Sequence, residues 1–176
     1  MIARIALKWG IGLGVAICIW TWIVHLLGWY TTDLAKGLRA DEVATILPLF
    51  FLYMAIREYS RRTDRAPKLL QALGVGVLTG LFSVPISSWF LWIYHHHINP
   101  QWLDILIAYQ RQHLAQTGAT PEVIEQTVTR LTRGGTDQAQ LIGALVGTIL
   151  ISIVISILVW ALMRFVTMRN RQVQEQ

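Results

Sequence analysis

Residues 138–163 read QAQLIGALVGTILISIVISILVWALM and contain no Asp, Glu, Lys or Arg. At about 1.5 Å of rise per residue, a helix of this length crosses the ~30 Å hydrocarbon core of a bilayer. Two further runs without these residue types lie between Lys8 and Asp33 and from Leu69 to Leu103. The three runs predict an integral membrane protein.

The composition of the whole chain points the same way. Of its 176 residues, 54% are hydrophobic and 14% are charged, whereas an average globular domain has about 25% charged residues. This balance excludes a soluble enzyme and a disordered segment. Cys18 is the only cysteine, which excludes an intrachain disulfide and a cysteine-based zinc site.

The charge-free runs place membrane spans at 9–31, 69–95 and 138–164. The first run follows Arg4 and Lys8 as a signal peptide would, but it is too long and lacks an Ala-x-Ala-like site, so we interpret it as a retained helix. Asn99-Pro100 is a stop signal after the third run.

A fourth span is predicted at 42–58, although its charge-free core, Val43 to Ile56, is short for a span. Arg39, Arg57 and Arg61 can extend it by snorkelling. Pro48 can bend it. An interfacial or re-entrant segment is the alternative.

Two amphipathic helices are predicted between the third and fourth spans, at 100–117 and 121–133. Thr120 fits the N-cap of the second, Pro121 fits its first position, and Gly134-Gly135 ends it. They either lie on the membrane surface, cap the bundle or offer a docking surface. The predicted fold is an all-α integral membrane domain over 1–176, with four transmembrane helices and an extracytoplasmic amphipathic helical connection between helices 3 and 4.

The basic residues predict the orientation. The N-terminus, the 57–68 loop and the 164–176 tail hold 2, 5 and 3 of the 15 Lys and Arg residues, so the positive-inside rule puts both termini in the cytoplasm. The net charge is +7 on that side and −2 on the other, which gives the +5 of the chain. We expect a bacterial inner-membrane protein with a cytoplasmic tail at 165–176 that contacts the lipid bilayer and binds no nucleic acid.

Pairs of glycines one helical turn apart occur in three of the predicted spans. The six residues are Gly10, Gly14, Gly76, Gly80, Gly143 and Gly147. Such pairs let helix backbones approach closely in lipid. We expect the first and third spans to be close neighbours in the inner leaflet; whether the pairs serve intrachain packing or oligomerisation is open.

Histidine and tryptophan side chains gather in the predicted outer half. His25, His95 and His97 are metal-ligand candidates, because imidazole is the commonest transition-metal ligand. The alternative is that histidines, like tryptophans, sit at the membrane interface. A tryptophan-lined pocket for a lipid, quinone or pigment is a further alternative.

The order of features resembles the bacterial domain-of-unknown-function family 4199, whose members are small four-helix membrane proteins. The residues that carry this resemblance are Met54-Ala55-Ile56-Arg57-Glu58-Tyr59, Gly74, Gly76, Gly80, Ile93-Tyr94 and Ile98-Asn99-Pro100. The resemblance implies the same four-helix architecture and no particular activity.

The predicted spans contain few residues that could take part in catalysis or ion transport. The first, third and fourth lack charged residues inside them, and the chain has no HExxH motif, no phosphate loop and no Ser/His/Asp set. We therefore expect a non-enzymatic protein without a cofactor, a structural or accessory subunit that binds other membrane protein subunits or itself. The alternatives are a small-molecule- or metal-binding membrane protein and an oligomeric transporter or channel.

Overall fold

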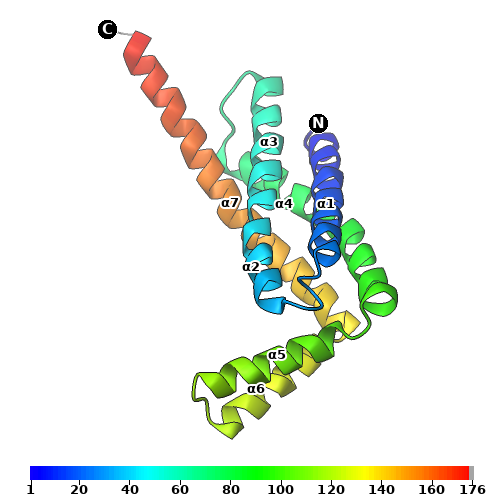
Figure 1. Cartoon of the computed structure of the whole chain (residues 1–176). Helices are drawn as coiled ribbons and strands as arrows, with labels where there is room; N and C mark the ends of the chain where they lie inside the picture. The colour runs from blue at the N-terminus through cyan, green and yellow to red at the C-terminus, as the bar shows by residue number, and fades with distance from the viewer. Residues whose placement is uncertain (175–176) are drawn as a thin grey trace.

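The computed structural model describes the backbone of residues 1–174 and the side chains of residues 1–165, and every regular element in that range is helical (Figure 1). In chain order the elements are α1 (Ile2–Leu26), α2 (Leu34–Ala44), α3 (Ile46–Thr63), α4 (Leu69–Ile93), the π-helical turn η1 (Tyr94–Ile98), α5 (Trp102–Gln116), α6 (Pro121–Gly134) and α7 (Asp137–Gln174).

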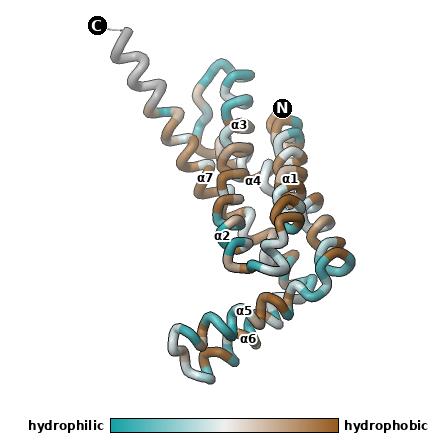
Figure 2. The backbone as a smooth tube through the Cα atoms, in the orientation of Figure 1, coloured by the Kyte–Doolittle hydropathy of each residue, from teal (hydrophilic) through white to brown (hydrophobic). Residues whose placement is uncertain are grey.

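Three helical segments are long and apolar enough to cross a membrane: Ile2–Leu26, Leu69–Ile98 and Asp137–Phe165. Figure 2 shows these as mostly hydrophobic tubes, with hydrophilic residues gathered at the turns and on the α5–α6 hairpin. The all-helical chain and its membrane-type helices are thus as predicted. α3 does not join this set, because Arg57, Glu58, Arg61 and Arg62 occupy its second half.

The single helix predicted at 42–58 is wrong in its extent. The chain instead forms two helices, α2 and α3, which meet at Thr45. Pro48 explains the break, because it has no N–H to donate to the carbonyl of Ala44 four residues earlier. Asp33 starts α2, since its side chain accepts a hydrogen bond from the backbone N–H of Lys36 at 3.3 Å.

The ends of the other predicted segments also move. The range 9–31 becomes α1, which begins at Ile2 and ends at Leu26, and a turn follows at Gly28 with φ +75°. The predicted ranges 69–95, 100–117 and 121–133 correspond to α4 with η1, α5 and α6.

The range 138–164 corresponds to the first part of α7. This helix continues through Gln174. Residues 165–174 of the predicted tail are therefore part of α7. Glu175 and Gln176 lie outside the described residues.

The core forms where α1, α3, α4 and α7 meet. It contains Ile5, Leu13, Leu52, Ala55, Ile56, Tyr59, Ala72, Val75, Ile155 and Val159. α3 packs against all three of the long apolar helices, and its Leu52, Ala55 and Ile56 are 0% exposed. The short helix is therefore an integral part of the bundle.

Both ends of the described chain and the turn between α3 and α4 lie at one end of the bundle, and α2 and the α5–α6 hairpin lie at the other (Figure 1). At the first end, Glu58 of α3 joins α1 to α3. It accepts hydrogen bonds from Lys8 Nζ at 2.9 Å, from Trp9 Nε1 at 2.7 Å and from Arg62 at 2.6 Å.

α1 and α4 approach closely at two glycines of α1. A Cβ atom on Gly10 would lie 2.6 Å from the Cβ of Phe82 and 2.6 Å from the carbonyl oxygen of Thr79. A Cβ on Gly14 would lie 2.9 Å from the Cβ of Ile86. The absence of side chains at these two positions is what permits the contact.

The glycines of α4 serve a different neighbour. A Cβ on Gly76 would collide with the hydroxyl of Ser156, and one on Gly80 with the hydroxyl of Ser152, both on α7. The expectation that the first and third spans are close neighbours is confirmed by the contact of α1 with α4. α4 uses its glycines toward α7 and other residues toward α1, because one helix has two contact faces.

Candidate functional site

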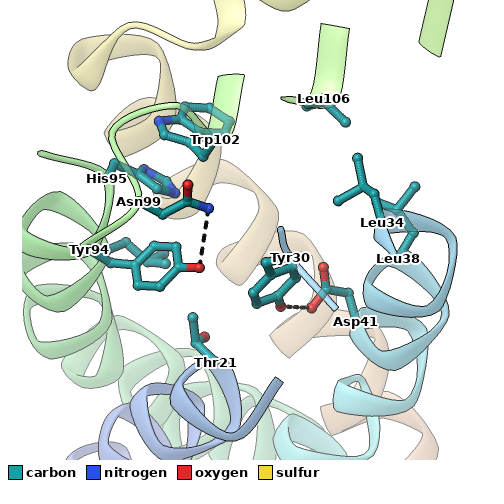
Figure 3. A pocket seen from close by; sticks show the side chains of 11 residues that line it. Thr21, Tyr30, Leu34, Leu38, Asp41, Tyr94, His95, Asn99, Trp102 and Leu106 are labelled. Carbon is teal, nitrogen blue, oxygen red and sulfur yellow. Dashed lines mark hydrogen bonds between the residues drawn. The ribbon is translucent and has the colours of Figure 1, made fainter. Parts of the chain in front are cut away.

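A cavity of about 340 Å³ lies at the end of the bundle that carries α2 and α5 (Figure 3). It is lined by Thr21, Tyr30, Leu34, Leu38, Asp41, Leu91, Tyr94, His95, Asn99, Trp102 and Leu106. These residues come from α1, α2, α4, η1, α5 and the turns between them. The volume is at the lower end of the usual range for small-molecule pockets, about 300–1,000 Å³.

One wall carries a tyrosine–carboxylate pair. The turn at Gly28 sends the chain back toward the bundle, and α2 packs on that turn at Gly37, where a Cβ would lie 2.7 Å from the carbonyl oxygen of Trp29. This packing brings together Tyr30 and Asp41, whose side chains form a hydrogen bond in which Tyr30 donates (Figure 3).

The same arrangement raises the pKa of both Asp41 and Tyr30. Partial removal of solvent raises the pKa of Asp41 above its usual value, and the hydrogen bond from Tyr30 opposes that rise. Burial and the neighbouring Asp41 raise the pKa of Tyr30, so Tyr30 remains a hydrogen-bond donor. Asp41 as a residue is exposed, which puts it at the mouth of the cavity.

The opposite wall is held by a second hydrogen-bonded group. The Tyr94 hydroxyl lies 2.9 Å from Nδ1 of His25, and Asn99 Nδ2 donates to it at 3.4 Å. Tyr94 and Asn99 are 3% and 5% exposed. The π-helical turn widens the end of α4 and ends at Ile98, so that Asn99 faces back toward Tyr94 (Figure 3).

The roof of the cavity is aromatic. The rings of His95 and Trp102 are stacked with centroids 4.1 Å apart and planes 18° apart, and Figure 3 shows Trp102 over His95, with Tyr94 below them. Four leucines complete the walls: Leu34, Leu38, Leu91 and Leu106. The cavity is thus apolar and aromatic with one carboxylate, and its eleven lining residues include no Lys or Arg.

The structure does not assemble a metal centre from the predicted histidines. His25 pairs with Tyr94, His95 stacks on Trp102, and His97 meets the edge of the Trp92 ring at 5.9 Å. Among the described residues, no three His, Cys, Asp or Glu side chains are grouped so that they could hold a metal ion. His25, His95 and His97 therefore do not come together at one site, and each has an aromatic neighbour instead.

Three tryptophans line hollows of the surface in two different places. Trp102 lines the cavity, whereas Trp89 and Trp92 line an open groove of about 440 Å³ between α4 and α7. Trp89 is 69% exposed, as expected for a ring that faces lipid at the interface. At the mouth of this groove, Nε2 of His96 lies 3.6 Å from a carboxylate oxygen of Asp137.

A second surface feature lies on α7. Within the described chain, no atom that could contact a new side chain lies within 4 Å of a Cβ built on Gly143 or Gly147. The neighbouring apolar residues Val146, Leu150 and Val154 are exposed. Of the three glycine pairs, this is the pair that the fold leaves uncovered.

Sequence reasoning missed Tyr30 and Asp41 as site residues, because residues 33–42 look like a charged loop. Two signals were present. Asp33 precedes an apolar residue as an N-cap does, and Leu34, Leu38 and Asp41 recur at three- and four-residue spacings, which puts them on one face of a helix. That face is the one that α2 turns toward the cavity.

Comparison with known proteins gives one result. A family model described as "Protein of unknown function (DUF4199)" matches residues 8–164, which confirms the family that the sequence resembles. No curated protein and no solved structure matches the chain. The match runs through the bundle from α1 to α7, and the chain therefore belongs to the DUF4199 family.

Proposed function

We propose that this protein is a non-enzymatic accessory subunit of a larger complex in the bacterial inner membrane. The observation that carries the proposal is the uncovered glycine pair of α7. The other two pairs are filled by helix contacts within the chain, whereas Gly143 and Gly147 have an open face. In lipid, such a face is stabilised by close packing against a further helix.

The α5–α6 hairpin supports the same function. It projects from the end of the bundle (Figure 1), and none of the residues of α5 or α6 is buried. The two helices pack on one another and touch the bundle mainly at the base of the hairpin. A hairpin that buries so little within its own chain is suited to contact with a partner subunit.

We also propose that the chain crosses the membrane four times, with α3 as the short second span. α3 is packed in the bundle core, and Ile46, Leu49 and Phe50 on its outer side are exposed, as lipid-facing residues would be. In this topology α2, α5 and α6 lie on the extracytoplasmic side, and both termini are cytoplasmic, in accord with the positive-inside rule.

The test of subunit function is purification in a mild detergent. The partner is expected to be a membrane protein that co-purifies with the wild-type chain and is lost in the Gly143→Leu, Gly147→Leu double variant. Gly74→Leu is the matched control, since Gly74 is also a helical glycine with an open Cβ position but has no glycine partner on its face.

Three outcomes decide the subunit proposal. Loss of the partner in the double variant alone supports docking on α7. A wild-type chain that purifies as a monomer without a partner overturns it, as does equal recovery of the partner from the double variant. A second copy of the chain as the partner appears as a dimer mass by light scattering and makes the complex a homo-oligomer.

The topology is tested with a membrane-impermeant maleimide on spheroplasts, in a Cys18→Ser background. With four spans, the Gln116→Cys variant is labelled and the Arg65→Cys variant is not. The two results are exchanged if the turn at 64–68 lies outside and the hairpin lies inside, as in a bundle inserted with the opposite orientation. The exchanged pattern would refute the proposed topology with both termini in the cytoplasm.

A second function, binding of a small molecule, is favoured by the cavity between α2 and α5. It has both an apolar interior and a few polar groups that converge on it, the combination expected of a ligand site.

A further inference from the structure

We propose that the cavity at the end of the bundle binds a small organic cation, an ammonium group attached to an apolar body. The proposal concerns a different part of the molecule from the α7 surface and does not depend on the docking of a partner. It rests on the carboxylate at the mouth, on the aromatic walls and on the apolar interior.

The carboxylate of Asp41 supplies the charge that recognises a cation. Tyr30 donates one hydrogen bond to Oδ1, whereas a carboxylate can accept about four. In the described part of the chain, no Lys, Arg or His forms an ion pair with Asp41. The group therefore has an unpaired negative charge and free acceptor positions in a partly desolvated place.

The cations on the same helix do not compensate for Asp41. Lys36 pairs with Asp33 at 2.8 Å at the start of α2, and neither Lys36 nor Arg39 lines the cavity. A ligand ammonium would meet no repulsion from the wall. An anion would be repelled by the carboxylate, and no positive side chain of the lining would compensate for this repulsion. The cavity therefore favours cations over anions.

The aromatic side chains provide the second element of recognition. Tyr30 and Tyr94 lie 6.2 Å apart between ring centroids at an angle of 67°, and Trp102 forms the roof (Figure 3). Ring faces attract a cation within about 6 Å, and tryptophan does so most strongly. An anionic group beside several aromatic rings is an arrangement that binds ammonium ions.

The leucines set the size and character of the rest of the ligand. Leu34, Leu38 and Leu106 lie across the cavity from His95 and Asn99 (Figure 3), and Leu91 completes the apolar lining. A volume of about 340 Å³ admits a compact amine with a hydrocarbon or aromatic body. The exposed position of Asp41 lets the ligand enter with its charge close to water.

The experiment is isothermal titration of the purified full-length chain in a neutral detergent. The probe is benzyltrimethylammonium, and benzyl alcohol and benzenesulfonate are its neutral and anionic counterparts. We expect the cation to bind at least tenfold more tightly than the alcohol and the anion to give no signal. Equal affinity for cation and alcohol would show non-specific apolar partition and overturn the proposal.

The variant Asp41→Asn removes the charge and keeps an oxygen that can accept the hydrogen bond from Tyr30. We expect its Kd for benzyltrimethylammonium to rise at least about tenfold, equivalent to about 1.4 kcal/mol. Glu42→Gln is the matched control: it removes the same charge from the next residue of α2, which does not line the cavity, and should change Kd less than about twofold. Equal effects of the two variants would refute the proposal.

A second variant covers the case in which Asp41→Asn unfolds. Trp102→Leu keeps an apolar side chain in the roof and removes the ring, and we expect it to weaken binding of the cation about two- to fivefold while binding of benzyl alcohol stays the same. A Trp102→Leu chain that binds cation and alcohol as the wild type does would count against the aromatic wall and thus against the site.

The ammonium group could belong to a soluble amine or to a lipid headgroup, and native mass spectrometry separates these sources. An adduct with the mass of a phosphatidylethanolamine that survives purification and disappears in Asp41→Asn identifies a lipid headgroup as the source. An adduct that forms only when the soluble amine is added identifies a free amine. No adduct of either kind, together with no heat on titration, would end the proposal.

Discussion

Gly10 and Gly14 set the distance between α1 and α4, and replacing them with alanine tests how tightly this contact is packed. A Cβ on Gly10 would lie 2.6 Å from both the Cβ of Phe82 and the carbonyl oxygen of Thr79. An ordinary contact begins at 3.4 Å, so α1 must move outward by about 0.8 Å. Since one of the two atoms belongs to the α4 backbone, a rotamer change cannot relieve the clash.

The size of the effect follows from two opposing contributions. Overpacking a well-packed contact costs about 1–3 kcal/mol, whereas replacing a helical glycine with alanine stabilises the helix by about 1 kcal/mol. Gly10→Ala should therefore lower the free energy of unfolding by about 0–2 kcal/mol. The same outward movement also relieves Gly14, so the double alanine variant should cost less than the sum of the single variants.

Reversible unfolding in mixed micelles of neutral detergent and dodecyl sulfate, followed by tryptophan fluorescence, measures this free energy. Gly74→Ala is the control, because a Cβ there meets no described atom within 4 Å, and it should be neutral or stabilising. The difference between Gly10→Ala and Gly74→Ala isolates the overpacking cost, expected at about 1–3 kcal/mol. If the two variants are equally stable, the α1–α4 contact is not as close as the Cβ distances at Gly10 indicate.

Three further predictions use the same assay. Glu58→Gln should lower the free energy of unfolding by about 1–3 kcal/mol, because the Glu58 side chain is only 17% exposed and loses its charge-assisted hydrogen bonds. Glu125→Gln is the control: the Glu125 side chain is 65% exposed, and the free energy of unfolding should fall by less than about 0.5 kcal/mol. Equal losses in the two variants would show that burial of Glu58 does not strengthen its ion pairs. Tyr94→Phe removes the hydroxyl that His25 and Asn99 contact and should lower the free energy of unfolding by about 1–3 kcal/mol. Tyr109→Phe, at a half-buried position on α5, should leave the free energy of unfolding unchanged. The same result for Tyr94→Phe would contradict the hydrogen-bonded wall of the cavity. Because the pKa of Asp41 is raised above 3.8 in the folded chain, the folded state holds this proton more tightly than the unfolded state, so the chain should lose stability as the pH rises upward from about 4. Asp41→Asn should remove that slope, and an unchanged pH profile would show that the carboxyl is not shielded.

Local sequence signals predicted the helices that depend on local chemistry. α6 begins at Pro121 after Thr120 and ends at Gly134, as its capping and breaking residues indicate. The π-helical turn stops at Ile98, directly before the Asn99-Pro100 signal. Such features need no information about neighbours, because a cap, a proline ring or a glycine acts within one turn of the helix.

The residues around Thr45 show where local signals were insufficient. Residues 33–42 are rich in charged side chains, as exposed loops often are, yet the segment is helical, and its Gly37 and Ala40 are buried. Propensity is a weak guide in such a case, and packing of an amphipathic face decides whether the helix forms. Hydropathy indicated one span at 42–58, whereas the chain forms two helices there, α2 ending at Ala44 and α3 beginning at Ile46.

The glycine pairs illustrate a third case, in which the pattern was visible but the partners were not. Ser152 and Ser156 each follow a glycine of the α7 pair by nine residues, and nine steps of about 100° lead to the opposite side of a helix. Counting alone thus puts the serines and the glycines on different faces. Which face would meet α4 was decided by the bundle: the serines pack against Gly76 and Gly80.

The sequence by itself determined that the chain is helical, that three segments are long and apolar enough to cross a membrane, and where α4, α5 and α6 begin and end. These properties follow from composition and from interactions within a few residues. Only the tertiary structure decided that Tyr30, Asp41, Tyr94 and Trp102 surround one cavity, and that one glycine pair remains uncovered. Both results depend on contacts between helices distant in the chain. The relative rotation of those helices is set by close packing of the whole bundle and cannot be read from any single segment.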